Sequence, residues 1–372
     1  MNVSLQDILY WSFVGVIAFQ LLYWLAMVAR FVFSKHKYIG HHPPKVSVII
    51  AARDEAKRLR KFIPKVMAQK AVEFEVIVVD DCSYDDTLDV LLDFQKVYPN
   101  FRFTQLRESS DFLGGKKYAL TLGVKSAKYE HLVFIDADCY PQTEYWLREM
   151  ALAVEARPMI LGIGLYERGK GFLNSLIRTE AAAIALQYMS FAKSGLPYMG
   201  VGRNMAYHSD LFFDNKGFAS HYHLKSGDDD LFVNEVANRK NTKGVFCHEA
   251  ITLSEPKRKW TDWLRQKQRH FTTAKKYRLI HKILLGSLSL SQYLLFGVLI
   301  ANLVTAVHWQ DVLILFGVRF LIQHLLFGVF LWKVGQKGLI FWIAIVEVLL
   351  LILYPVIVLR GVAEKANAWK RI

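Results

Sequence analysis

Residues 131–138 read HLVFIDAD and residues 74–81 read FEVIVVDD, so both are apolar runs that end in paired aspartates. Continuous runs rich in Val and Ile predict strands that are buried on both faces, as in a parallel sheet flanked by helices. In such sheets ligands bind at the carboxyl ends of the strands. The aspartates of both runs are therefore predicted to face one crevice, where like charges repel unless a cation or a proton intervenes.

The alternation of strands and helices continues on both sides of these runs. Strands that alternate with helices form right-handed βαβ units and predict an α/β nucleotide-binding sheet. Pro141 is placed at the first turn of a helix, because proline is tolerated there. The predicted strands cover 46–52, 74–81, 101–106, 131–136 and 158–165, and the predicted helices include 56–70, 87–96, 171–192, 231–238 and one that begins at Lys116.

The acid clusters indicate a divalent metal with a bound diphosphate. Hard cations take oxygen ligands from one or two carboxylates together with phosphate oxygens. A third cluster, Asp228-Asp229-Asp230, directly precedes a predicted helix. Cys82 and Cys139 each follow an acid cluster, but they lack zinc spacing, which favours small buried residues over thiolate ligands. Three cysteines in this arrangement do not predict a disulfide framework.

Four long apolar stretches explain an apolar content of 53%. They cover residues 8–29, 283–307, 312–332 and 339–359, and each reaches the roughly 20 residues that cross a bilayer core. The first has no basic leader and no small-residue cleavage site, so it is predicted to be a retained anchor. Arg319 and Glu347 lie within two of these stretches and are predicted to form a structural ion pair rather than to line a channel.

The net charge of +14 is concentrated beside the apolar stretches. Lys and Arg residues follow the first stretch and precede the second, which predicts that the α/β region faces the cytoplasm. The excess positive charge is then attracted to anionic headgroups of membrane lipids, and no nucleic acid is expected as a partner. The basic carboxyl tail conflicts with four full spans, and Pro355 leaves the form of the last span open.

Six motifs between Val46 and His270 occur in a recognisable order. They are Val48–Glu55, Val79–Ser83, Lys116–Leu120, Asp136–Asp138, Gly227–Asp229 and Gln266–His270. In this order they resemble the membrane-bound branch of the family 2 inverting glycosyltransferases, which includes cellulose, chitin and hyaluronan synthases and ceramide glucosyltransferase. Asp54 stands where the family usually has Asn, and His270 stands where it has Trp.

The resemblance implies a GT-A fold joined to transmembrane helices, a nucleotide-diphosphate sugar donor (UDP-linked) and Mg²⁺ or Mn²⁺. It implies that Asp229 is the catalytic base, with Asp228 as the alternative. Asp138 and Asp136 are the implied metal ligands, and the acceptor side is assigned to Asn204, Trp263 and His270. The implied donor-binding residues are Ala52, Asp54, Glu55, Asp80, Asp81, Lys116, Asp136, Gln266 and Arg269.

The acceptor is left open between a lipid or lipid-linked molecule and a growing polysaccharide. His270 stacks on a sugar less well than Trp, which favours single transfer to a membrane-embedded acceptor over processive synthesis. A sugar nucleotidyltransferase is a weaker alternative, because it needs no spans. The expected organisation, for a bacterial inner-membrane protein, is an anchor over 1–33, a cytoplasmic GT-A domain over 46–256, a basic interface region over 257–282, about three spans over 283–360 and a tail over 361–372.

Overall fold

The computed structural model describes residues 4–34, 42–107, 115–224, 226–306 and 308–369. The chain forms two compact units, which are described separately. We call Lys35–Lys257 the sheet unit, and we call Met1–Ser34 together with Arg258–Ile372 the helical unit.

Two sheets organise the sheet unit. The larger has the strand order β3-β2-β1-β4-β8-β6-β9, and the smaller has the order β5-β10-β7. The strands are β1 (Val46–Ala52), β2 (Phe74–Asp81), β3 (Phe101–Leu106), β4 (His131–Phe134), β5 (Cys139–Pro141), β6 (Met159–Leu161), β7 (Ile163–Tyr166), β8 (Met205–His208), β9 (Thr242–Gly244) and β10 (Ile251–Ser254). Strands β1, β2, β3 and β4 run parallel, so their carboxyl ends share one edge.

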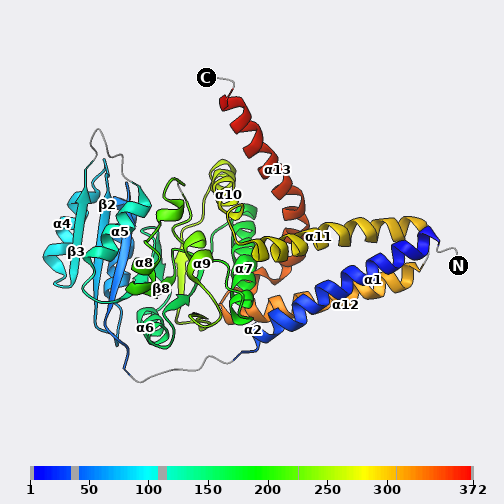
Figure 1. Cartoon of the computed structure of the whole chain (residues 1–372), viewed down its shortest axis with the longest axis horizontal. Helices are drawn as coiled ribbons and strands as arrows, with labels where there is room; N and C mark the ends of the chain where they lie inside the picture. The colour runs from blue at the N-terminus through cyan, green and yellow to red at the C-terminus, as the bar shows by residue number, and fades with distance from the viewer. Residues whose placement is uncertain (1–3, 35–41, 108–114, 225, 307, 370–372) are drawn as a thin grey trace. The chain divides into compact units, whose positions relative to one another are not determined.

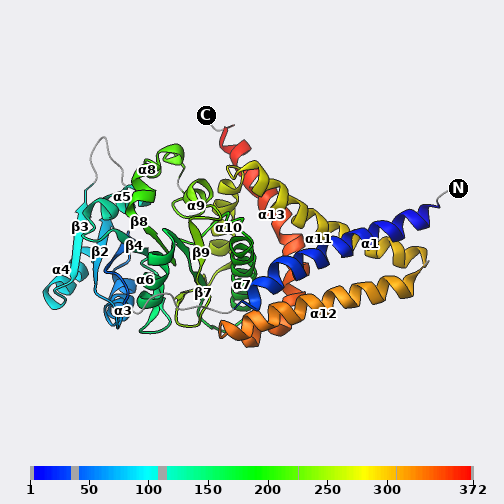
Figure 2. The same ribbon diagram turned by 60° about the horizontal axis from the view of Figure 1, so that its bottom comes forward.

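Helices cover both faces of the larger sheet (Figures 1 and 2). The helices of this unit are α3 (Ala56–Met67), α4 (Thr87–Val97), α5 (Lys116–Ser126), α6 (Trp146–Ala156), α7 (Phe172–Lys193), α8 (Ser209–Asp214), η2 (Ala219–His221) and α9 (Asp230–Val236). The main core joins α3, α4 and α6 to one face of β1 and β2, through residues such as Leu59, Leu91, Met150, Val48 and Val78. On the other face α5 packs against Ile77 and Val79.

The predicted α/β sheet is confirmed, with three local differences. Strand β8 runs antiparallel to β4 and β6, so the sheet is mixed rather than all parallel. Residues 158–165 form two strands in different sheets, because the chain leaves β6 at Gly162 and enters β7. Pro141 lies in β5, where it pairs with Thr252, and the following helix begins only at Trp146. Helix α7 packs against β7 and β9.

Among the described residues, the helical unit contains four helices that are long and apolar enough to cross a membrane, by length and composition. They cover Leu5–Val32, Leu279–Thr305, Trp309–Lys333 and Lys337–Arg360. The elements are α1 (Leu5–Tyr23), the π-helical η1 (Trp24–Ala29), α2 (Arg30–Val32), α10 (Trp260–Ala274), α11 (Leu279–Thr305), α12 (Trp309–Lys333), η3 (Lys337–Trp342) and α13 (Ile343–Trp369). Helix α13 continues through Pro355.

A polar network lies among these apolar helices. Arg319 is fully buried, and its Nη2 lies 2.7 Å from Oε1 of Glu347, so the predicted pairing is confirmed. Arg319 also donates from Nε to Gln20 and from Nη2 to Gln292, at 2.7 and 3.2 Å. The network joins α1, α11, α12 and α13, and its internal bonding offsets the cost of placing charges among apolar helices.

Candidate active site

The carboxyl ends of β1 and β2 bring the first acidic pair into position. Ala52 pairs in register with Asp80, and both are buried. Oδ1 of Asp80 accepts from the backbone N–H of Ser83, at 3.2 Å, whereas its buried Oδ2 has no partner in the part of the chain that the structure describes. Oδ1 of Asp81 accepts from the backbone N–H of Gly115 at 2.7 Å. A buried carboxylate oxygen without a donor favours a ligand that supplies an N–H or O–H.

Two loops at this edge are tied together by Asp54. Its backbone N–H donates to Oγ of Ser83, and its Oδ1 accepts from the N–H of Tyr84, at 2.9 and 2.8 Å. Asp54 has a φ of +54°, a left-handed conformation that Asn and Asp adopt more readily than most residues. Asp therefore suits the backbone at a position where the family usually has Asn.

Glu55 lies beside Asp54 in the same loop. Its Oε2 accepts from Nη1 of Arg58 at 2.7 Å, and burial raises the pKa of its carboxyl. Asp138 raises that pKa further, which places Glu55 within electrostatic reach of the next acidic cluster.

Lys116 links the second and third acidic clusters. Its Nζ lies 2.9 Å from Oδ1 of Asp136 and 2.7 Å from Oδ2 of Asp228. Burial would lower the pKa of Lys116, but the carboxylates of Asp136, Asp228 and Asp229 raise it well above its usual value. The ammonium of Lys116 therefore holds together the carboxylates of Asp136 and Asp228, which are far apart in the sequence.

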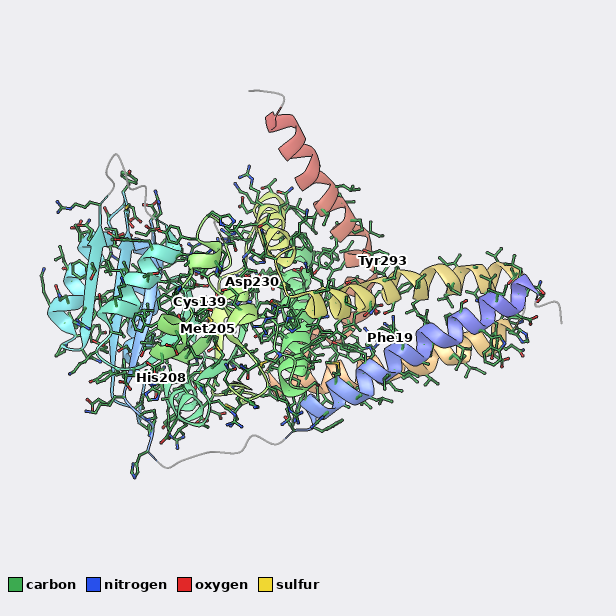
Figure 3. The ribbon with its side chains drawn as sticks, in the orientation of Figure 1. Phe19, Cys139, Met205, His208, Asp230 and Tyr293 are labelled. Carbon is green, nitrogen blue, oxygen red and sulfur yellow. The ribbon has the colours of Figure 1, made fainter. Side chains whose placement is uncertain are left out.

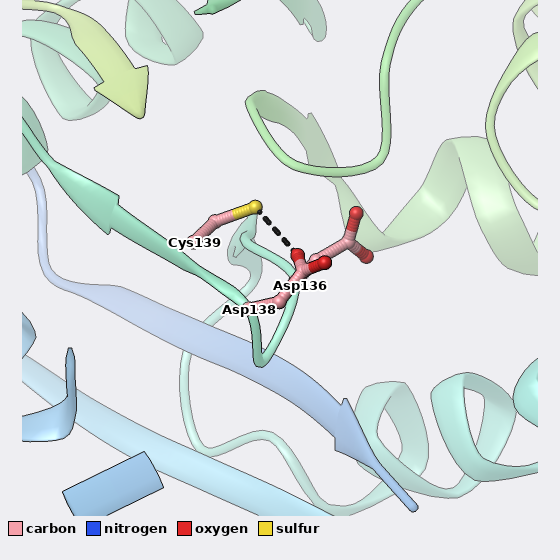
Figure 4. A group of neighbouring side chains, drawn as sticks. All are labelled: Asp136, Asp138 and Cys139. Atoms are coloured by element: carbon pink, nitrogen blue, oxygen red, sulfur yellow. Dashed lines mark hydrogen bonds between the residues drawn. The ribbon is translucent and has the colours of Figure 1, made fainter. Parts of the chain in front are cut away.

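Asp136 and Asp138 lie in the turn between β4 and β5, with Cys139 beside them (Figure 4). One potential ligand atom from each of the three lies within 4.8 Å of the others. The thiol of Cys139 donates to Oδ1 of Asp138 at 3.0 Å, and burial raises the thiol pKa well above its usual value. Cys139 is therefore a neutral thiol, whereas the two half-buried carboxylates offer oxygen ligands that suit Mg²⁺ or Mn²⁺.

The third cluster begins α9. Asp229 caps the helix: Oδ1 accepts from the N–H of Asp230 at 2.8 Å, and Oδ2 accepts from the N–H of Gly202 at 2.9 Å. Burial, together with the charges of Asp228 and Asp230, raises the pKa of Asp229 to about 7. Burial would also raise the pKa of Asp228, but Lys116 holds it below its usual value. Figure 3 labels Asp230, the last residue of this cluster, and Cys139 of the β4–β5 turn.

Asn204 has contacts that differ from the predicted role at the acceptor side. It is fully buried, and its Oδ1 accepts from Nε1 of Trp146 at 2.9 Å. Its Nδ2 donates to the carbonyls of Ile163 and Ala250, at 2.8 and 2.7 Å. Both amide hydrogens are thus used, and a Cβ on Gly162 would come within 2.4 Å of the Asn204 side chain. These contacts favour a structural role that joins α6 to both sheets.

Lys117 was not singled out by the sequence. Its buried Nζ donates to the carbonyls of His221 and Leu224, at 2.6 and 3.0 Å. The segment it holds immediately precedes the acidic triplet, so adjacent lysines bind a carboxylate of that triplet and the backbone before it. The sequence feature that could have pointed to Lys117 is its position directly after Lys116.

The remaining predicted residues belong to α10 of the helical unit. Trp263 is fully buried and packs edge-on against Trp260, with ring centres 5.7 Å apart. Arg269 and His270 are exposed, and Gln266 is half-buried. Their predicted contacts with donor or acceptor involve the sheet unit and stay predictions.

Comparison with known families identifies the chain. The model described as "Glycosyl transferase family 2" matches residues 47–213, and the model "Glycosyl transferase family group 2" matches residues 131–360. The chain belongs to the family 2 glycosyltransferases. The first match contains Asp80, Asp81, Lys116, Asp136 and Asp138, and the second contains the acidic triplet and extends into the helical unit.

Two curated relatives of this glycosyltransferase match part of its length. Poly(ribitol-phosphate) beta-N-acetylglucosaminyltransferase TarS from Staphylococcus aureus is 26% identical over 209 residues, 55% of this chain and 35% of TarS. The 4,4′-diaponeurosporenoate glycosyltransferase from Staphylococcus haemolyticus is 30% identical over 148 residues, 37% of this chain and 38% of that protein. The chain thus spans little more than a third of the length of these relatives.

A solved structure resembles the whole glycosyltransferase chain. The mannosyltransferase PcManGT from Pyrobaculum calidifontis, in complex with GDP-Man and Mn²⁺, is 18% identical and has a TM-score of 0.56. The match covers 94% of this chain and 99% of PcManGT. At this identity the likeness concerns the fold, and with the family match it confirms the GT-A fold predicted from the sequence.

Proposed function

We propose that this chain is a membrane-bound inverting glycosyltransferase. It transfers a sugar from a nucleotide-diphosphate sugar, UDP-linked, to a lipid or a lipid-linked acceptor. The observation that carries the proposal is the pair formed by Asp228 and Asp229 at the start of α9. One carboxylate is ionised and held by Lys116, while its neighbour has a pKa of about 7.

Asp229 has the properties of a general base. A base works best when its pKa lies near the working pH, because it is then both deprotonated and able to accept a proton. Two N–H donors fix its orientation, at 2.8 and 2.9 Å. Asp229 would take the proton of the acceptor hydroxyl as that oxygen attacks the sugar carbon from the face opposite the leaving diphosphate. This attack inverts the configuration at the anomeric carbon of the sugar.

The donor is assigned to the edge formed by β1, β2 and β4. The unpartnered Oδ2 of Asp80 suits an N–H or hydroxyl of the nucleoside. Lys116 lies between this edge and the acidic triplet, where its ammonium would contact the diphosphate. Asp54 and Glu55 keep the adjoining loop in place, and Ala52 brings the end of β1 level with Asp80.

A divalent metal fits the residues between β4 and β5. Asp136 and Asp138 are half-buried carboxylates whose oxygens can approach a common point, and they would hold Mg²⁺ or Mn²⁺. PcManGT, which shares the fold, was solved with Mn²⁺. Such a cation would neutralise charge on the leaving diphosphate.

The acceptor is assigned to the membrane because four apolar helices belong to the same chain. We propose that the sheet unit lies on the cytoplasmic side of a bacterial inner membrane, and the basic residues that flank the apolar helices support this orientation. The domain boundaries predicted from the sequence are retained, and the roles predicted for Trp263, Gln266, Arg269 and His270 of α10 stay predictions. The names of the two relatives indicate that family members act on a ribitol-phosphate polymer and on diaponeurosporenoate.

A donor panel tests the proposal. The purified chain is incubated with individual UDP-sugars and GDP-sugars, a bacterial lipid extract and Mn²⁺, and the released nucleotide and the lipid products are measured. We expect one UDP-sugar to give nucleotide release together with a lipid that is heavier by one sugar. Asp229→Asn should lower both signals by about 10²–10⁴-fold while it preserves donor binding. Turnover of GDP-sugars alone would overturn the UDP assignment, and polysaccharide as the product would favour the processive alternative.

A further inference from the structure

Arg203 is a cation whose charge the proposed mechanism does not use. Its Nη2 donates to the carbonyl of Gly164 at 2.9 Å, and its guanidinium carbon lies 4.5 Å from the centre of the Tyr166 ring. Its buried Nε has no hydrogen-bond partner among the described residues, and none of their carboxylates lies at ion-pair distance from it. Arg203 is half-buried, and burying part of a cation without an anionic partner costs solvation free energy.

The chain accommodates this cation at a specific place. A Cβ at position 164 of β7 would lie 2.4 Å from Nε of Arg203. Only glycine at this position therefore leaves room for the Arg203 side chain. Thr252 on β10 donates its hydroxyl to the carbonyl of Arg203, at 3.0 Å. The arginine is thus fitted along the smaller sheet rather than extended into solvent.

The smaller sheet connects Arg203 with the aspartates of the β4–β5 turn. In register, Ser254 on β10 pairs with Cys139 on β5 and with Tyr166 on β7. Side chains of residues paired in register lie on the same face of a sheet. Cys139 and Ser254 are in contact at 2.8 Å, and Arg203 stacks on Tyr166. Because neighbouring strands are about 4.8 Å apart, Tyr166, on which Arg203 stacks, lies about 10 Å across this row from Cys139.

The backbone brings Arg203 near the proposed base. Gly202, the preceding residue, donates its N–H to Oδ2 of Asp229. Arg203 therefore directly follows, in the chain, a residue that orients the base. Lys116 contacts Asp136 and Asp228, where the donor diphosphate is assigned. A second cation near the base suits a second anion.

We infer that Arg203 binds an oxyanion of the acceptor, a phosphate or carboxylate close to the hydroxyl that receives the sugar. The inference rests on the proposed function and narrows its substrate class to anionic acceptors. A guanidinium matches the planar, two-oxygen geometry of such groups. The free Nε and the absence of a carboxylate partner leave Arg203 with the capacity to bind one.

Matched acceptors test the inference. Dioctanoylglycerol and dioctanoylphosphatidylglycerol share their acyl chains and a free hydroxyl, but only the second carries a phosphate oxyanion. A second pair, methyl 2-hydroxystearate and 2-hydroxystearate, tests a carboxylate next to the hydroxyl. Wild type, Arg203→Met and Arg203→Lys are compared with the donor that the panel selects, and KM for acceptor and donor is measured along with thermal stability.

We expect wild type to favour the anionic member of one pair. A hydrogen bond to a charged group contributes about 1.5–3 kcal/mol, which corresponds to about a ten- to hundredfold preference. Arg203→Met should lose that preference through acceptor KM, leaving donor KM unchanged, and Arg203→Lys should keep part of it. The pair that shows the preference identifies the anion as phosphate or carboxylate.

Three results would overturn the inference. They are the absence of any anionic preference in wild type, an equal loss with both members of a pair in Arg203→Met, and an effect confined to donor KM. Binding of dioctanoylphosphatidylglycerol and of 2-hydroxystearate to donor-free protein, followed by native mass spectrometry, gives a readout without turnover. Binding that depends on Arg203 in a protein without transferase activity would refute the proposed function and support the anion site. The absence of both transferase activity and Arg203-dependent binding would refute the proposed function and the anion site together.

Discussion

The pH dependence of transfer follows from the environment of Asp229. Its pKa of about 7 results from burial and from the charges of Asp228 and Asp230. The carboxylate form then rises from about one-tenth of the protein at pH 6 to about nine-tenths at pH 8. Because only the carboxylate can accept the acceptor's proton, kcat/KM should increase about tenfold over this interval. An aspartate at its ordinary value of 3.8 would give no change there.

A neighbouring substitution moves this profile in a defined direction. Asp228→Asn removes a negative charge that raises the pKa of Asp229, so the rising limb should shift to lower pH. Asp210→Asn, in the first turn of α8 and exposed, is the matched control and should leave the limb in place. The assay is the initial rate of nucleotide release between pH 5 and 9 at saturating donor and metal. A flat profile in wild type, or a limb that Asp228→Asn leaves unmoved, would refute the reasoning.

Three further predictions concern single residues. Asp138→Ala should abolish transfer and weaken donor binding measured by calorimetry, and EDTA should have the same effect on wild type; full activity in EDTA would contradict the metal site. Because the pKa of Asp229 is raised in the fold, its contribution to stability is lost as pH rises from about 4 to 7; Asp229→Asn should therefore raise the melting temperature more at pH 8 than at pH 5. His270→Trp should slow transfer to a lipid acceptor, whereas a processive enzyme should preserve or lengthen its products; a sugar ladder from wild type, resolved by mass spectrometry, would contradict single transfer.

Local patterns were sufficient to predict the central acidic residues. The apolar runs before Asp80 and Asp136 are long enough to define buried strands, and the carboxyl ends of parallel strands share an edge. Asp229 was expected at a helix start, and it caps α9. The direction of β8 could not be predicted, because its four residues carry no signal that separates parallel from antiparallel pairing.

Properties that depend on distant residues could not be predicted. The buried position of Asn204 depends on Trp146, which lies 58 positions away, and the sequence alone assigned this residue to the acceptor side. The position of the Arg203 side chain could not be predicted either, because it depends on Gly164, which lies 39 positions earlier. The raised pKa of Asp229 likewise requires knowledge of burial, since three adjacent aspartates in solvent would titrate near their usual values.

The configuration of the product tests the central claim most directly. We propose that Asp229 is the base that assists attack of the acceptor hydroxyl on the sugar carbon, from the face opposite the diphosphate. With a donor whose sugar is α-linked to UDP, proton NMR of the first product should show a β-linked sugar, before any later rearrangement. The same measurement on the slow product of Asp229→Asn should again show β. An α-linked product from wild type would contradict the inverting mechanism and the role assigned to Asp229.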